Sequence, residues 1–205
     1  MKKKNKYKKQ DLDQKKSRIF AELERLYQKM EMAYNEIASR LGLKCSECED
    51  NCCVSYFQHH THIEWAYFFK GLKTLSQDRQ KQIISRAKEY VDLSKKELEK
   101  GIRPKIMCPV NENGLCILYK YRLMICRLHG IPNTVKMPNG ITKKFPGCSM
   151  CIVLTKNSPY FPMMDRTPFY QALADLERRF TKLLKNPIPK VDYTLAQMIL
   201  LGAPK

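Results

Sequence analysis

Cysteine is concentrated in a few short stretches of this 205-residue chain, and this pattern constrains the fold more than any other feature. Thiolates two or three residues apart can converge on one metal centre. The nine cysteines form a quartet within nine residues, a looser second group and a final C-x2-C pair: Cys45, Cys48, Cys52 and Cys53, then Cys108, Cys116 and Cys126, then Cys148 and Cys151. Neither the quartet nor the second group alone offers a well-partitioned ligand set. We therefore expect the fold to bring the two groups together around bound metal.

The cysteines are expected to be reduced thiols rather than disulfides. The basic N-terminus is not followed by the apolar stretch of a signal peptide, and no segment approaches the roughly 18 apolar residues of a membrane span. These features predict a cytoplasmic protein, in which thiols are kept reduced. The odd number of cysteines, nine, also argues against a disulfide framework.

The chain is strongly basic, with a formal net charge of +18. Part of this charge lies in residues 1–10, which include six lysines. A run of like charge is usually a solvated tail, so we predict a basic disordered tail over 1–10. The alternative is a contact arm for an anionic partner, either nucleic acid or anionic lipid. Metal-bound thiolates would lower the real charge, because metal ligands are deprotonated.

Helical periodicity dominates the remainder of the sequence, which predicts a mainly α fold with small β-hairpins around a cysteine-rich metal-binding centre. Apolar residues recur every three or four positions along one long amphipathic helix over 11–42, and Gly42 is a natural end. Thr61 and Glu64 predict a capping box at the start of a second helix. Ser76 is expected to cap a third helix, which ends at Gly101.

Two turns and two further helices complete the expected organisation. Asn113-Gly114 and Asn139-Gly140 predict short hairpins, the second over 133–145. Thr167-Pro168 is a strong helix start, and Asp192 is expected to cap a last short helix. We assign 43–151 to a cysteine-cluster metal-binding region, and 152–205 to a C-terminal helical segment packing on the same domain.

The cysteine spacing leaves the partition of ligands open. Cys45 and Cys48 with the C-x2-C pair at 148–151 would match the two knuckles of a zinc ribbon, but five cysteines would then have no role. The alternative is that the quartet and the second group share ligands. Neighbours such as Cys52 and Cys53 rarely both reach one metal. The adjacent pair therefore indicates two metals, or one ligand beside a supporting thiol.

The cysteine pattern resembles that of a known family. The run from Cys45 to Cys53 is similar to the C-x2-C-x3-C-C signature of the YkgJ-type cysteine-cluster family, described as a zinc- or iron-chelating domain. The second part of the family signature is Cys-Pro, a short turn, and then Cys-x-Ile-Tyr-x-x-Arg-Pro-x-x-Cys-Arg. The matching residues are Cys108-Pro109, Cys116-Ile117-Leu118-Tyr119, Arg122-Leu123 and Cys126-Arg127. Leu123 stands where the family usually has proline, and the likeness covers roughly residues 43–151.

The resemblance implies about eight metal-linked cysteines. The seven of the first two groups carry over directly, and Cys148 or Cys151 could be the eighth. Arg122 and Arg127 belong to the matched motif and flank Cys126. They would contact the cofactor and compensate the charge of an anionic metal–thiolate centre; the alternative is that they are ordinary surface arginines.

Histidines and aromatic residues near the quartet have two interpretations. Histidine is a common metal ligand, yet thiols are already abundant, so all four histidines are only secondary candidates: His59, His60, His62 and His129. Trp65, Phe68 and Phe69 could line a cofactor, but their helical spacing favours core positions.

Three functions remain open. The first is a metal-binding protein that chelates an iron–sulfur cluster or zinc, with the cluster slightly favoured by the closely spaced cysteines. The second is a metal-dependent enzyme related to flagellin lysine N-methylases, which share the signature. The sequence has no Gly-rich dinucleotide loop, and we identify no catalytic residue. The third is a basic nucleic-acid- or ribosome-associated zinc module.

Overall fold

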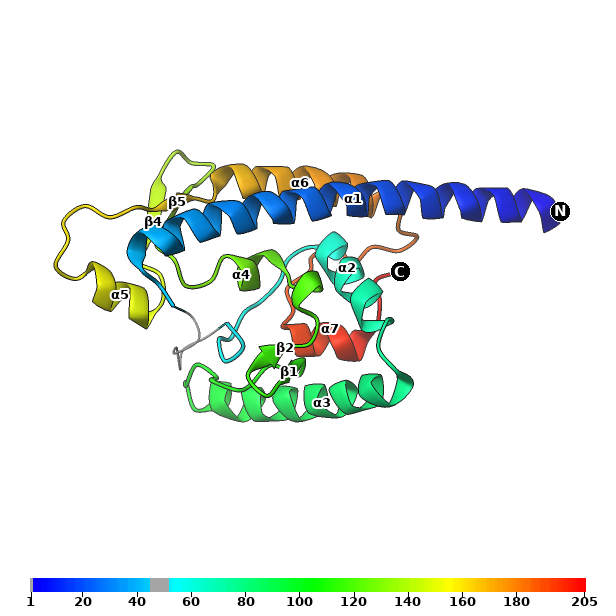
Figure 1. Ribbon diagram of the computed structural model, residues 1–205. Coiled ribbons are helices and arrows are strands. Elements are labelled where there is room, and N and C mark those ends of the chain that lie inside the picture. The colour runs from blue at the N-terminus through cyan, green and yellow to red at the C-terminus, as the bar shows by residue number, and fades with distance from the viewer. Residues whose placement is uncertain (1, 45–51) are drawn as a thin grey trace.

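The computed structural model of the protein describes residues 2–44 and 52–205 (Figure 1). These residues are mainly helical, with two small sheets, as the sequence predicts. The helices are α1 (Lys2–Leu41), α2 (His62–Leu72), α3 (Gln77–Glu99), α4 (Met124–Arg127), α5 (Ser149–Thr155), α6 (Thr167–Thr181) and α7 (Leu195–Leu201). A 3-10 helix, η2, covers Tyr119–Tyr121. The strands are β1 (Asn111–Glu112), β2 (Leu115–Cys116), β3 (Asn133–Lys136), β4 (Thr142–Phe145) and β5 (Met164–Asp165). None of the described helices is long and apolar enough to cross a bilayer.

Helix α1 runs along one side of the molecule beside α6 (Figure 1). Its apolar stripe is buried, with Leu23 and Met30 fully inaccessible, and the Glu22 carboxylate lies 2.5 Å from the Arg179 guanidinium of α6. The helix ends at Leu41, and Gly42 follows with the positive φ (+66°) of a helix stop. Its start differs from the prediction, because α1 continues back to Lys2 where we expected a disordered tail. Lysine is a good helix former, so an established helix can extend through such a run.

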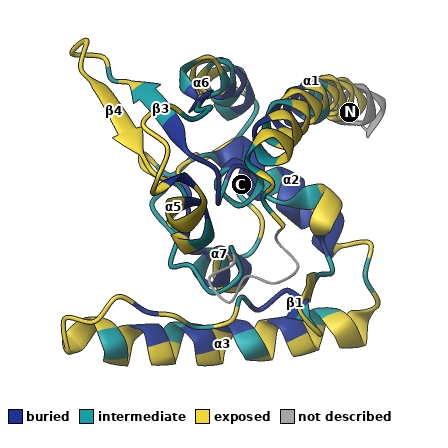
Figure 2. Ribbon diagram, turned by 60° about the vertical axis from the view of Figure 1, so that its left-hand side comes forward, coloured by how far each residue is buried: buried dark blue, intermediate teal, exposed yellow. Residues whose placement is uncertain are grey.

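Helix α2 is mostly buried (Figure 2), and its residues contribute to two separate hydrophobic cores. Ile63 and Tyr67 face the core formed with α1 and α6. Trp65 and Phe68 face the core formed with α3 and α7, and Phe69 joins them there. The prediction that these three aromatic residues are core residues is confirmed.

The start of α2 is capped differently from the prediction. Thr61 is the N-cap residue, but its side chain does not cap the helix; it donates to a Glu64 oxygen at 2.8 Å. The amides of His62 and Ile63 donate instead to the two oxygens of Glu177 on α6, at 2.9 Å each. A carboxylate from another helix thus neutralises the positive helix end. This contact leaves Glu64 available to bind elsewhere in the core.

The other two predicted caps have different outcomes. Ser76 caps α3 as predicted, since its hydroxyl accepts from the Arg79 amide. Asp192 does not cap α7. Thr194 and Gln197 form a capping box there, because a threonine three residues before a glutamine satisfies two backbone donors reciprocally.

Both predicted hairpins are present. Strands β1 and β2 pair across Asn113-Gly114, where both residues have positive φ. Strands β3 and β4 pair with Asn133 opposite Phe145, and β5 adds to β3 in parallel. Strand β4 is therefore an edge strand. Helix α5 was not predicted, because its sequence was interpreted as a cysteine knuckle.

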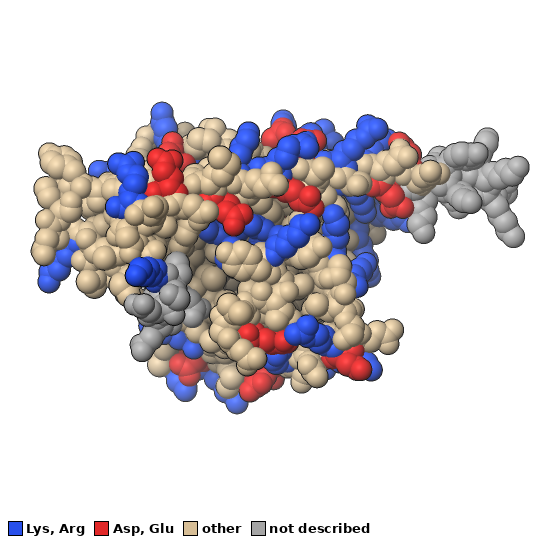
Figure 3. Space-filling model, viewed as in Figure 1, with Lys and Arg blue, Asp and Glu red and all other residues tan. Residues whose placement is uncertain are grey.

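Charged side chains of both signs cover the face along α1 (Figure 3). Several pair along the helix, as Lys15 does with Asp11 at 2.6 Å. Exposed pairs of this kind contribute little stability, roughly 0–1 kcal/mol each. The two cores therefore hold the fold, and the surface charge determines what the molecule attracts.

Gly71 lets η2 approach α2 closely. A Cβ atom at this position would lie 2.3 Å from two ring carbons of Tyr121, a side chain that packs against both cores. We expect Gly71→Ala to lower the free energy of unfolding by about 2 kcal/mol, because the clash outweighs alanine's better helix propensity. Urea denaturation measures this change. An unchanged midpoint would mean that Tyr121 can move aside at little cost.

Candidate metal centre

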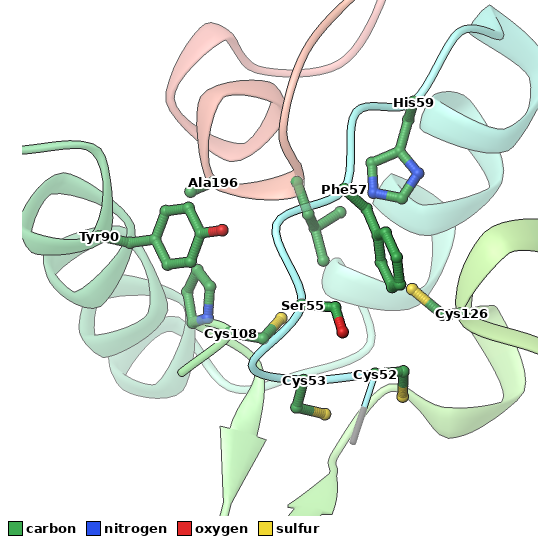
Figure 4. Close-up of a pocket in the computed structure, with 11 residues that line it drawn as sticks. Cys52, Cys53, Ser55, Phe57, His59, Tyr90, Cys108, Cys126 and Ala196 are labelled. Carbon is green, nitrogen blue, oxygen red and sulfur yellow. The ribbon is translucent and has the colours of Figure 1, made fainter. Parts of the chain in front are cut away.

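Four of the predicted ligand cysteines line one pocket between α3, α4 and α7. Cys52 and Cys53 come from the end of the quartet, and Cys108 and Cys126 from the second group. Figure 4 shows their side chains with Ser55, Phe57 and Tyr90 around the same space. The structure thus brings together thiols that lie more than fifty residues apart in the chain.

Backbone contacts position these cysteines. The Cys108 amide donates to the Cys53 carbonyl oxygen at 2.7 Å, which ties the two groups directly to each other. Cys126 lies in the single turn of α4, and Cys116 pairs with Asn111 across the β1–β2 ladder. Each thiol is therefore fixed by a different local structure, and only the tertiary fold aligns them.

Burial and mutual repulsion keep most of these thiols protonated in the absence of a cation. Burial raises the pKa of Cys126 to about 12, and the nearby Cys116 and Cys53 thiols contribute to this shift. Burial also holds the pKa of Cys108 well above its usual range, with Cys126, Cys53 and Cys116 adding to it. Thiols that raise one another's pKa in this way share one electrostatic environment, which a metal cation would stabilise by binding their thiolates.

The thiols of the adjacent residues Cys52 and Cys53 have pKa values shifted in opposite directions. The hydrogen bond from the Cys52 thiol lowers the pKa of Cys53 to about 6, and the Asn111 side chain and Arg122 also favour the thiolate. The same hydrogen bond raises the pKa of Cys52. The Asn111 side chain thus acts as a hydrogen-bond donor to the Cys53 sulfur. A donor beside a thiolate suits a site that binds anionic sulfur.

This asymmetry predicts an order of chemical modification. In metal-free protein at neutral pH, iodoacetamide is expected to alkylate Cys53 before Cys108 and Cys126, because only a thiolate is nucleophilic. The Cys53 rate should rise with pH through a midpoint near 6. Peptide mass mapping of a time course measures the order. Equal rates at Cys53 and Cys126 would contradict it.

The two predicted arginines occupy different positions around the site. Arg122 lies over the Tyr119 ring, 3.5 Å from its centroid. It lowers the pKa of Cys53 together with the hydrogen bond from Cys52, and it opposes the larger effects that raise the pKa of Cys52, Cys116 and Cys126. Arg127 stacks on the Tyr27 ring at 3.9 Å, and its Nε donates to the Arg122 carbonyl at 2.8 Å. Arg122 thus supplies positive charge to the thiols, whereas Arg127 mainly holds the loop that carries Arg122.

Glu64 is a site residue that the sequence analysis assigned only to a helix cap. Its carboxylate is buried and accepts from the Tyr27 hydroxyl at 2.9 Å and from the Met124 amide at 2.6 Å. Met124 is the first residue of α4, the helix that carries Cys126. Burial raises the pKa of Glu64 despite these donors. Glu64 therefore fixes the start of the helix that presents Cys126.

The four histidines separate by environment. His59 is buried and lines the pocket (Figure 4), and burial lowers its pKa to about 3, so its ring is neutral. His62 Nδ1 lies 2.7 Å from Glu177, away from the thiols. His60 lies 3.4 Å from Asp192, and the His129 ring packs on Phe57. His59 alone among the four lines the pocket, and a neutral imidazole ring is the form that binds metal.

The remaining predicted ligands do not line this pocket or lie outside the described residues. Cys151 is buried on α5 and Cys148 is buried at the N-cap of that helix, where its amide donates to the Gly130 carbonyl oxygen at 2.9 Å. Cys45 and Cys48 lie in the segment 45–51, outside the described residues, so the zinc-ribbon pairing stays a prediction. Within residues 2–44 and 52–205, no three His, Cys, Asp or Glu side chains are placed to hold one metal ion.

No family model matches the chain, and no curated protein or solved structure matches it either. The resemblance to the YkgJ-type family therefore rests on the cysteine motif itself.

Proposed function

We propose that this protein binds a thiolate-ligated metal centre, either an iron–sulfur cluster or zinc, at the pocket of Cys52, Cys53, Cys108 and Cys126. The observation that carries the proposal is that these four cysteines, from three separate segments of the chain, line one pocket. Soft thiolates select iron–sulfur clusters and zinc over harder cations. Partly buried thiols grouped without such a centre would only repel one another on ionisation.

The surroundings of the thiols support an anionic centre. Arg122 favours the thiolate form of four of the cysteines, and the Asn111 side chain favours that of Cys53. The chain between Glu112 and Asp165 also contains no acidic residue but seven lysines and arginines. Donors and positive charge next to metal-bound sulfur stabilise its negative charge.

The YkgJ-type motif extends this proposed ligand set. Cys45 and Cys48 precede Cys52 by a few residues, and Cys116 is coupled electrostatically to Cys53. We include all three with the four pocket cysteines, which gives the seven cysteines that carry over directly from the motif. An iron–sulfur cluster would supply electron transfer at this place, whereas zinc would supply folding energy alone.

Anaerobic purification followed by metal and acid-labile sulfide analysis tests the proposal. We slightly favour a brown protein that contains iron and sulfide; colourless protein with stoichiometric zinc would instead identify a structural zinc site. Cys53→Ser should reduce the bound metal in either case, whereas Ser149→Ala, an exposed change on α5, should not. Purified protein without iron or zinc, and unable to bind either one, would refute the proposal.

A further inference from the structure

Helix α5 exposes aliphatic side chains to solvent instead of packing them against the body of the protein. It buries Cys151 and Thr155 against the body. Ile152, Val153 and Leu154 are left outside, with 47%, 70% and 43% of their surfaces exposed. Single exposed apolar residues need no explanation, but three in succession do.

Further exposed apolar side chains lie on the chain segments next to α5. Tyr160, in the loop that follows α5, is 91% exposed, and Phe145 on the edge strand β4 is 45% exposed. Strand β4, its turn and α5 form one end of the molecule (Figures 1 and 2). We name this end, residues 136–160, the α5 tip.

The charge of the α5 tip has a single sign. It contains four lysines and no acidic residue, and the lysines are Lys136, Lys143, Lys144 and Lys156, all exposed. The next acid along the chain, Asp165, accepts from the Thr167 amide. Glu36 on the neighbouring helix α1 lies 3.8 Å from Arg40. The corresponding end of the molecule in Figure 3 is mostly uncharged surface with scattered basic side chains.

We propose that the α5 tip docks onto the surface of an anionic lipid bilayer. Interfacial anchors combine inserted aliphatic and aromatic side chains with lysines at headgroup level, and the tip presents both. Positive charge at the tip complements the negative surface of anionic lipids, and each lysine near the surface adds attraction. A single-stranded nucleic acid would instead need a series of aromatic platforms, and the exposed apolar residues here are mostly aliphatic.

Vesicle flotation with the full chain tests this docking. We expect binding to vesicles of phosphatidylcholine mixed with phosphatidylserine, and little binding to phosphatidylcholine alone. Ile152→Ser/Val153→Ser should lower the partition coefficient about tenfold through lost apolar insertion. Lys143→Gln/Lys144→Gln should lower it by a similar factor. The two variants separate the apolar from the electrostatic contribution.

A matched pair on another helix serves as the control. Leu200 and Leu201 are adjacent, 40% and 54% exposed, and end the equally short helix α7. Leu200→Ser/Leu201→Ser should leave vesicle binding unchanged, and unchanged melting temperatures would show that all three variants fold. Equal losses in the control and α5 variants would overturn the proposal. Vesicle binding as strong as that of the unchanged protein in both tip variants would also overturn it, since the lysines of residues 1–10 would then account for the attraction. Retention on single-stranded RNA without vesicle binding would assign the tip to nucleic acid instead.

Discussion

Replacing Cys126 by serine is expected to release bound metal and to lower the melting temperature of the metal-loaded protein by about 10–20 °C. Cys126 is half-buried in the single turn of α4 and lines the pocket with three other cysteines. A structural metal contributes on the order of 10 kcal/mol to the stability of small domains. For a chain of this size, losing about half of that contribution lowers the melting temperature by about 10–20 °C. Calorimetry or circular dichroism, with metal analysis of the same sample, measures both effects.

Chelated protein and a second cysteine variant control for simple damage to the core. After metal removal, Cys126→Ser and the unchanged protein should melt within a few degrees of each other, because both then lack the metal contribution. Cys151→Ser alters another buried thiol on α5 and should retain the metal. If Cys126→Ser keeps its metal and its melting temperature, this pocket is not the metal centre. Metal loss in Cys151→Ser would add the α5 cysteines to the ligand set.

Replacing Glu64 by alanine should destabilise the protein by about 3–5 kcal/mol even without metal. The change removes the acceptor for the Met124 amide and the Tyr27 hydroxyl, both at the buried junction of α1, α2 and α4. Buried donors left without partners, together with the cavity, account for a loss of this size. Urea denaturation of the chelated protein measures it. Metal affinity should fall as well, because the start of the helix that carries Cys126 is no longer fixed.

Glu24 provides a matched control for Glu64. Its carboxylate also accepts from a tyrosine hydroxyl, that of Tyr67 at 3.0 Å, but it is only half-buried and lies near Lys70. Glu24→Ala should cost less than about 1 kcal/mol, since water can replace the lost partner. Glu64→Gln retains one accepting oxygen and should fall between the two alanine variants. Similar losses for Glu24→Ala and Glu64→Ala would refute the role assigned to Glu64.

The amino-acid sequence by itself determined the local structure where short-range chemistry is decisive. The apolar period of α1, the Ser76 cap of α3 and the two Asn-Gly turns each depend on neighbouring residues, and each is present in the structure. The core positions of Trp65 and Phe68 follow from the same periodicity. The sequence also indicated which cysteine groups should meet, because neither group alone offers a well-partitioned set of ligands.

Tertiary structure alone decided the contacts between segments distant in the chain. Glu177 caps α2 from more than a hundred residues away, which leaves Glu64 to hold α4. Both outcomes contradict a capping box that local spacing favours, because a buried amide binds whichever carboxylate the packing of the helices brings to it. Sequence spacing likewise placed Cys148 and Cys151 with the other ligands, but they are buried at the N-cap and in the first turn of α5, outside the pocket. Only the three-dimensional arrangement determined which thiols share an electrostatic environment, since that interaction depends on distance in space.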